Sequence, residues 1–218
     1  FSVLPETQSI YALVISVIIL SFVGLMAGPK NLPPDSALIA GIGAIGAGLA
    51  VGFAGLSGIG QGIAASSSVS TLTKEKISLG KPMIFSVLPE TQAIYGLLIA
   101  IFIIHGLGFF GTSVKDIPLG LSLVTVGAGL AIGISGLTAI GQGIAAASGA
   151  SATAENPRIF SRSLIFSILP ETQSIYALVV SILMLTTTGI MAGTIISGTT
   201  KAFYIGLGTI GAGLAIGF

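Results

Sequence analysis

The sequence predicts an all-α membrane protein built from tandem transmembrane helical hairpins. Composition is the first reason: of the 218 residues, 53% are hydrophobic and 7% are charged, and the mean hydropathy is +1.06. Apolar runs of at least about 18 residues are typical of helices that span a bilayer. The second reason is an internal repeat, because a fixed period indicates one structural unit used several times.

The apolar runs predict six spans, which pair into repeats of two helices. They lie at about 1–28, 37–65, 83–111, 117–147, 164–193 and 202–218. We expect an outer helix of a truncated hairpin at 1–28, complete hairpins at 37–111 and 117–193, and the start of a further inner helix at 202–218. The chain begins and ends within a repeat, which suggests a fragment of a longer array.

A polar motif recurs inside these apolar runs. It reads LPETQSIY, LPETQAIY and LPETQSIY, and places Glu at positions 6, 90 and 171, which are 84 and 81 residues apart. A charge at the bilayer centre costs at least ~2.5–3.5 kcal/mol, so an acid kept there predicts a function. Gln61 and Gln142, in Gly-rich runs, each precede the next motif Glu by 29 residues.

Spacing predicts that the Gln and the Glu of one hairpin lie at the same depth. The midpoints of the two Gln–Glu intervals fall at Glu75 and at Asn156-Pro157, where a turn is expected. Each polar residue is then ~22 Å from its turn. On a helical wheel the motif Glu faces away from the Thr, Gln and Tyr that follow it. One helix therefore offers its acid to one neighbour and its oxygens to the other, a head-to-tail arrangement that closes into rings.

Side-chain size predicts two layers of helices. The Gly-rich helices can approach one another closely and suit an inner ring, whereas the bulkier Glu-bearing helices suit an outer one. Pro89, next to Glu90, is expected to kink its helix.

Charge predicts the orientation in the membrane and the class of partner. Five of the eight basic residues lie in the loops at 66–81 and 149–162, so we expect these loops on the cytoplasmic side. The net charge is +1, which gives no reason to expect nucleic acid; the lipid bilayer is the expected environment. The chain has no Cys, so thiolate chemistry is excluded.

The residues around each acid favour a hard, monovalent cation. A Thr hydroxyl, two Gln amides and a Tyr hydroxyl can join one carboxylate, and such all-oxygen sets suit cations without redox chemistry. A divalent ion would leave net charge in the membrane. We therefore expect Na⁺, with H⁺ as competitor and no organic cofactor. The alternative is that the polar groups only hydrogen-bond between helices.

A Gly-rich helix ending in GQG, followed 29 residues later by LPETQ and a downstream Tyr, resembles the membrane-rotor proteolipid of vacuolar and archaeal rotary ATPases. This proteolipid, the c or K component of the rotor, is multi-hairpin, and the oxygen set resembles its sodium-binding members. The resemblance implies a rotor ring of copies of the chain in a prokaryotic plasma membrane. It also implies a stator subunit with a basic residue, and a central stalk at the loops around Lys74 and Arg158. ATP chemistry would occur on other subunits, so the chain is not expected to be an enzyme.

The resemblance also implies the ion-binding residues, each site being shared by two hairpins. One site would contain Gln61, Glu90, the Leu4 carbonyl, Thr7, Gln8 and Tyr11. The next would contain Gln142, Glu171, the Leu88 carbonyl, Thr91, Gln92 and Tyr95. Partial sites would be Glu6, and the set Leu169, Thr172, Gln173 and Tyr176, each needing a hairpin outside this sequence.

Two other functions remain open at this stage. The chain could be a cation channel or pore module, in which rings of Glu line a water-filled path. It could also be a structural proteolipid with inert buried polar pairs. All three motifs keep their acid, which implies one ion per hairpin; the direction of transport, the ring size and the number of hairpins in the full chain are not given by the sequence.

Overall fold

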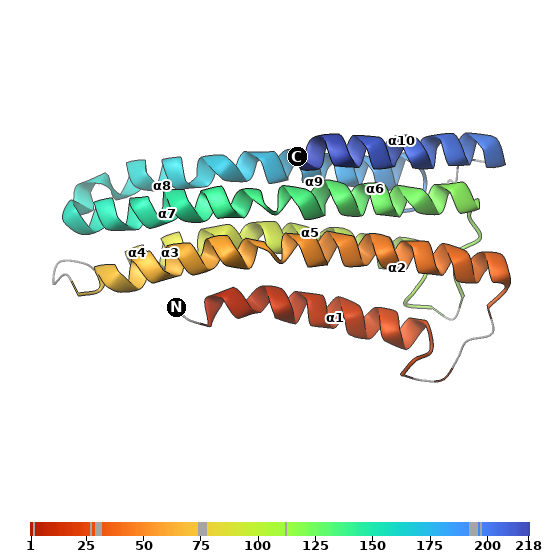
Figure 1. Ribbon diagram of the computed structural model, residues 1–218, viewed down its shortest axis with the longest axis horizontal. Helices are drawn as coiled ribbons and strands as arrows, with labels where there is room; N and C mark the ends of the chain where they lie inside the picture. The colour runs from red at the N-terminus through yellow and green to blue at the C-terminus, as the bar shows by residue number, and fades with distance from the viewer. Residues whose placement is uncertain are drawn as a thin grey trace.

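The computed structural model describes residues 1, 3–26, 28, 32–73, 78–111, 113–191, 196 and 198–218. Within these ranges every regular element is a helix, and the helices lie side by side along one long axis (Figure 1). The predicted all-α class is thus confirmed.

Each predicted span consists of one or more helical segments. In chain order they are η1 (Leu4–Glu6), α1 (Thr7–Phe22), α2 (Pro34–Ala54), α3 (Ser57–Thr71), α4 (Gly80–Val87), η2 (Leu88–Glu90), α5 (Thr91–Leu107), α6 (Leu119–Ser135), α7 (Thr138–Glu155), η3 (Pro157–Ile159), α8 (Phe160–Ile168), η4 (Leu169–Glu171), α9 (Thr172–Thr187) and α10 (Thr199–Gly217). The η elements are short 3₁₀ turns.

Five helices in the described residues are long and apolar enough to cross a membrane. They are Leu4–Phe22, Pro34–Thr71, Gly80–Leu107, Leu119–Glu155 and Pro157–Thr187. The sixth predicted run, 202–218, forms the helix α10, which is not among these five. Its first turn, Thr199–Lys201, is polar, which lowers its apolar character.

The polar loops predicted after the inner helices are shorter than expected. Residues 66–71 and 149–155 continue α3 and α7 as helix. Their hydroxyls are satisfied locally, as when Ser66 and Ser70 donate to the carbonyls of Ile63 and Ser67, so these residues stay helical despite their polarity. The expected turn at Asn156 is present, since α7 ends at Glu155. The turn expected at Glu75, with Lys74 and Lys76, falls outside the described residues.

The helices form the two layers that side-chain size predicts. In the inner layer α6 packs between α2 and α10, and α3 packs on α7. In the outer layer α5 packs on α2 and α9 packs on α6, while α5 also contacts both α1 and α9. The C-terminal ends of α3 and α7 lie at one end of the bundle, the hairpin-loop end, and the N-terminal ends of α2, α6 and α10 lie at the other (Figure 1).

The inner helices approach so closely that only glycine fits at the contacts. A Cβ on Gly129 would overlap the Gly46 carbonyl, and a Cβ on Gly213 would overlap the Gly127 carbonyl. These two contacts are equivalent in the repeat, so α2 meets α6 in the same way as α6 meets α10. The interface is head-to-tail, as a ring requires.

Both layers break near the middle of their helices. The inner helices are interrupted between α2 and α3 and between α6 and α7, at Gly55 and Gly136. The outer helices are interrupted by the 3₁₀ turns η2 and η4, which begin just before Pro89 and Pro170. At Pro89, where a kink is expected, the helix thus changes to a 3₁₀ turn, and Glu90 and Glu171 are the last residues of these turns.

Candidate functional site

The 3₁₀ turn in each outer helix places a leucine carbonyl two residues before the acid. In η2 the Leu88 carbonyl accepts the backbone amide of Thr91, and the Thr91 hydroxyl also donates to it over 2.9 Å. A proline cannot donate an amide, so the local ladder tightens to a 3₁₀ turn here. The same Thr-to-Leu bond of 2.9 Å occurs at Thr7 and at Thr172.

The first site joins η1 and α1 with the hairpin that follows. The Tyr11 hydroxyl donates to Glu90 Oε1 over 2.7 Å, and Gln61 Nε2 donates to Glu90 Oε2 over 3.1 Å. Gln61 Oε1 in turn accepts from Gln8 Nε2 over 2.6 Å. Gln8 Oε1 lies 3.2 Å from the Thr7 hydroxyl. Both carboxylate oxygens of Glu90 are thus partnered.

The second site repeats this arrangement one hairpin further along the chain. The Tyr95 hydroxyl donates to Glu171 Oε1 over 2.7 Å, and Gln142 Nε2 donates to Glu171 Oε2 over 3.2 Å. Gln142 Oε1 accepts from Gln92 Nε2 over 2.7 Å. The Thr91 hydroxyl lies 3.5 Å from Gln92 Oε1. Every polar contact described above for the first site therefore has a counterpart in the second.

The structure brings together the residues expected for each of the two complete sites. Each site takes its acid and one Gln from one hairpin, and its Thr, second Gln and Tyr from the preceding outer helix. Tyr95 follows Glu90 by five residues on the same outer helix, yet its hydroxyl meets the acid of the next hairpin. This is the division between neighbours that the helical wheel predicts.

The amides at these sites are buried in the protein. Gln61, Gln92 and Gln142 have no exposed surface, and Glu171 is 8% exposed. A polar group without a partner in such a place is costly, and a connected network avoids that cost. The sites can hold an acid inside the membrane only because the whole chain of donors and acceptors is complete.

The residues of the partial sites are not brought together with an acid or amide of another hairpin within the described residues. Glu6 is exposed, as are Leu169, Thr172 and Gln173. Tyr176, 62% exposed, lines a cavity of about 140 Å³ together with Gln173 and several residues of α6, α7 and α10.

Sequence reasoning missed several hydroxyls beside the sites. Ser57 lies 3.5 Å from Gln8 Nε2 in the first site. Near the second site, Thr138 lies 2.9 Å from Ser174. One signal was available: the motif residue equivalent to Ser174 is Ala93 in the middle copy, and this is the motif's point of variation.

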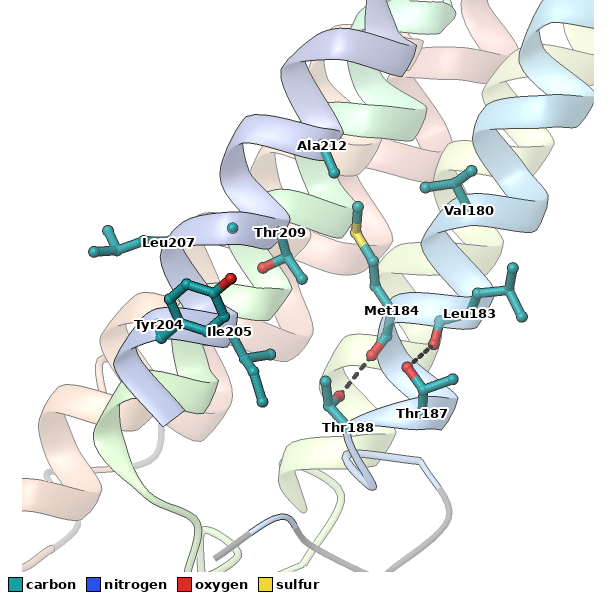
Figure 2. Close-up of a pocket in the computed structure, with 11 residues that line it drawn as sticks. Val180, Leu183, Met184, Thr187, Thr188, Tyr204, Ile205, Leu207, Thr209 and Ala212 are labelled. Atoms are coloured by element: carbon teal, nitrogen blue, oxygen red, sulfur yellow. Dashed lines mark hydrogen bonds between the residues drawn. The ribbon is translucent and has the colours of Figure 1, made fainter. Parts of the chain in front are cut away.

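A larger groove runs between α9 and α10, away from both complete sites (Figure 2). It encloses about 700 Å³ and its walls are mainly apolar. The hydroxyls of Thr187 and Thr188 donate to Leu183 and Met184 carbonyls of their own helix, so they are already satisfied. One hairpin earlier, α9 itself packs at the corresponding place beside α5 and α6. The groove is thus a helix-packing face.

These features define a class of protein: a proteolipid of tandem hairpins, with an acid held between neighbouring hairpins inside the membrane. Residues 45–103 and 126–184 match the ATP synthase C-subunit family, and the chain belongs to that family. The K subunit of the A-type ATP synthase of Methanocaldococcus jannaschii is 42% identical over 185 residues, which cover 85% of this chain and 76% of that protein.

The names of two further relatives specify different ions. The human 16 kDa proteolipid of the V-type proton ATPase is 34% identical over 165 residues, covering 74% of this chain and 99% of that protein. The K subunit of the V-type sodium ATPase of Enterococcus hirae is 35% identical over 102 residues, covering 46% of this chain and 60% of that protein.

The family and the fold together place the chain in its complex. It is a multi-pass integral membrane protein and a rotor proteolipid of a rotary ATPase of the V/A type, with Glu171 buried in its interior. It is a non-catalytic component, so ATP chemistry belongs to other subunits. The predicted family is thereby confirmed.

Proposed function

We propose that the chain carries Na⁺ across the membrane on a rotating ring, one ion at each site centred on Glu90 or Glu171. The observation that carries this proposal is the same oxygen-rich network formed twice between adjacent hairpins. A carrier of protons needs only the carboxyl. The additional Thr and Gln oxygens have a purpose if they replace the water around a metal ion.

The chemistry of the donors fits a small hard cation. In the first site the Thr7 hydroxyl lies 2.9 Å from the Leu4 carbonyl and 3.2 Å from Gln8 Oε1, so one hydroxyl proton serves two acceptors. Such a gathering of carbonyl, hydroxyl and amide oxygens suits a hard cation. Gln61 supplies a further amide oxygen. In the second site the Leu88 carbonyl, Thr91, Gln92 and Gln142 have the same roles.

Charge favours a monovalent ion. Each site has one carboxylate, so Na⁺ leaves it neutral, and a neutral site can face lipid without the cost of a buried charge. H⁺ neutralises the carboxylate equally well and is the expected competitor. The hydroxyls of Tyr11 and Tyr95 orient the two carboxylates toward the other oxygens.

Ion exchange would drive the rotation. As a site reaches the stator, a basic residue on that separate subunit would pair with the emptied carboxylate and favour release of the ion. The ring would consist of further hairpins or copies of the chain, and Glu6 and the set Leu169, Thr172, Gln173 and Tyr176 would be completed by neighbouring hairpins. The hairpin-loop end, with Arg158, would face the cytoplasm and meet the central stalk. A prokaryotic plasma membrane is the proposed location.

Carbodiimide labelling of the full-length protein in detergent tests the ion. The reagent modifies protonated carboxyls, and the modified residues are located by mass spectrometry. We expect NaCl to protect Glu90 and Glu171, while equal KCl does not. Labelling that ignores sodium would identify a proton carrier and reduce the Thr and Gln oxygens to structural hydrogen bonding. Absence of labelling at any pH would contradict the ion-carrier function itself.

A further inference from the structure

The two complete hairpins differ in how their helices are held together. In the second, two buried serines of α9 donate to backbone carbonyls of α6: Ser174 to Ser135 over 2.9 Å and Ser181 to Ala128 over 3.0 Å. Both serines are fully buried. These bonds tie the outer helix to the inner helix along two turns on the linker side of the acid.

The break in the inner helix explains why the Ser135 carbonyl can accept the hydrogen bond from Ser174. The amide four residues on, that of Ala139, donates to Gly136 over 3.2 Å and leaves the Ser135 carbonyl without its usual helical partner. The Thr138 hydroxyl donates to this carbonyl over 2.8 Å and lies 2.9 Å from the Ser174 hydroxyl. The Ser135 carbonyl and the hydroxyls of Thr138 and Ser174 thus form one partly buried polar layer between α6, α7 and α9.

The first hairpin has no such layer. The positions of Ser174, Ser181 and Ser135 are occupied there by Ala93, Ala100 and Ala54. Within the described residues no side chain of α5 hydrogen-bonds to α2 or α3. Close packing replaces the bonds, because a Cβ on Gly96 would overlap the Ala54 side chain and a neighbouring carbonyl. The first hairpin is thus held by close apolar packing where the second has directional hydrogen bonds.

The segment of the outer helix that these bonds hold begins at the helical turn that carries Glu171. Ser174 lies three residues after Glu171, on the same face of the helix, and the 3₁₀ turn at Pro170 separates this segment from α8. The bond between Gln142 and Glu171 joins the same hairpin one turn away. Displacing the acid from Gln142 by moving the start of α9 would therefore also strain the Ser174 bond.

From these contacts we propose that the hairpins are of two kinds, one whose outer helix is tied to the inner helix by hydrogen bonds and one whose outer helix is held by close packing. We infer that Glu171, in the tied kind, leaves its ion-binding site more slowly than Glu90. Ser174 and Ser181 are positioning residues: they do not touch the ion but hold the turn that carries the acid. The inference rests on the proposed ion exchange at these acids. The outer helix α1 has Ser9 and Ser16 at the positions equivalent to Ser174 and Ser181.

The size of the effect follows from the number of bonds. A side-chain hydrogen bond between helices in a membrane changes an equilibrium by about threefold on average. Two tying bonds therefore predict that Glu171 opens about tenfold less often than Glu90.

Labelling rates in the intact ring test the proposal. Full-length rings in detergent are treated with a carbodiimide without sodium, at an acid pH where labelling no longer depends on pH. Under these conditions the rate at each acid reports its opening and not its affinity for an ion. We expect Glu90 to react about tenfold faster than Glu171.

Exchanging the hydroxyls provides the decisive comparison. Ser174→Ala with Ser181→Ala should raise the rate at Glu171 toward that of Glu90, and Ser174→Thr, which keeps a hydroxyl, should retain a slow rate. Ser148→Ala is the matched control, because Ser148 is exposed and donates only within its own helix. The reverse exchange, Ala93→Ser with Ala100→Ser, should slow Glu90.

The outcomes separate this inference from the proposed function. Equal rates at Glu90 and Glu171 in the wild-type ring, or a rate at Glu171 unchanged by the double serine variant, would overturn the two kinds of hairpin while leaving ion exchange intact. If no acid reacted at any pH, the proposed function itself would be contradicted. If the reverse exchange prevented ring assembly, the serine-to-alanine variants would still decide the matter.

Discussion

The substitution Tyr95→Phe removes one hydroxyl and tests which acid each tyrosine serves. Along the sequence Tyr95 belongs with Glu90, five residues before it. In space its hydroxyl donates to Glu171 Oε1 over 2.7 Å, whereas Glu90 accepts a hydrogen bond from the Tyr11 hydroxyl. We therefore expect the substitution to weaken sodium binding at Glu171 and to leave Glu90 unchanged.

The expected magnitude is bounded by two measured ranges. Hydrogen bonds between membrane helices average about 0.6 kcal/mol and reach about 1.7 kcal/mol. A bond to a charged group contributes about 1.5–3 kcal/mol. The Tyr95 hydroxyl meets a carboxylate inside the membrane, so a value in the overlap of the two, about 1.5 kcal/mol, is expected, which corresponds to about tenfold in affinity.

The assay is the sodium concentration that gives half-protection against carbodiimide, read separately at each acid by mass spectrometry. Tyr95→Phe should raise it about tenfold at Glu171 only, and Tyr11→Phe should raise it at Glu90 only. Tyr204→Phe is the control, because Tyr204 is 78% exposed on α10 (Figure 2). A change at Glu90 in the Tyr95 variant, or equal changes at both acids, would refute the assignment of each site to two hairpins.

Three further predictions use other parts of the structure. Gln142→Leu removes the amide that joins Gln92 to Glu171, and sodium protection at Glu171 should weaken by more than about tenfold; an unchanged titration would contradict its place in the site. Gly129→Ala should destabilise the ring by about 1–3 kcal/mol, seen as a lower dissociation temperature, because its Cβ would overlap a neighbouring carbonyl. Gly41→Ala is its control, since a Cβ there meets nothing within 4 Å, and equal effects would count against the packing argument. Acid pH should raise the sodium concentration for half-saturation, measured with isotopic sodium, by up to about tenfold per pH unit because one proton competes with one ion; sodium binding that ignores pH would exclude the carboxylate as a ligand.

Local pattern predicted the helices better than it predicted their ends. Long apolar runs require a buried or lipid-facing helix whatever the neighbours, so the class of fold could be read directly. The segments 66–71 and 149–155 belong to the predicted loops 66–81 and 149–162, yet they are helical. Hydroxyls of the first segment donate hydrogen bonds to carbonyls within the helix. Composition alone does not reveal whether such residues form helix or loop.

The candidate sites show the same division between chain and fold. Equal spacing from the hairpin turn placed Gln142 and Glu171 at one depth, because the rise per residue of a helix is constant. The resemblance supplied the residues from the preceding helix. The Ser135–Thr138–Ser174 layer was missed, since it depends on a carbonyl released by a break in the inner helix, which follows from how α6 and α7 pack.

By itself the sequence determined that this protein is a membrane array of repeated two-helix units with one acid in each, because hydropathy and period are properties of the chain alone. Only the tertiary structure shows the hydrogen bonds by which Tyr11 and Tyr95 reach their acids, and only it decided which helices are tied by hydroxyls. Those contacts join residues 76 to 79 and 39 to 53 positions apart. Such pairs meet only after the helices have packed side by side, and packing depends on glycines and helix breaks elsewhere in the chain.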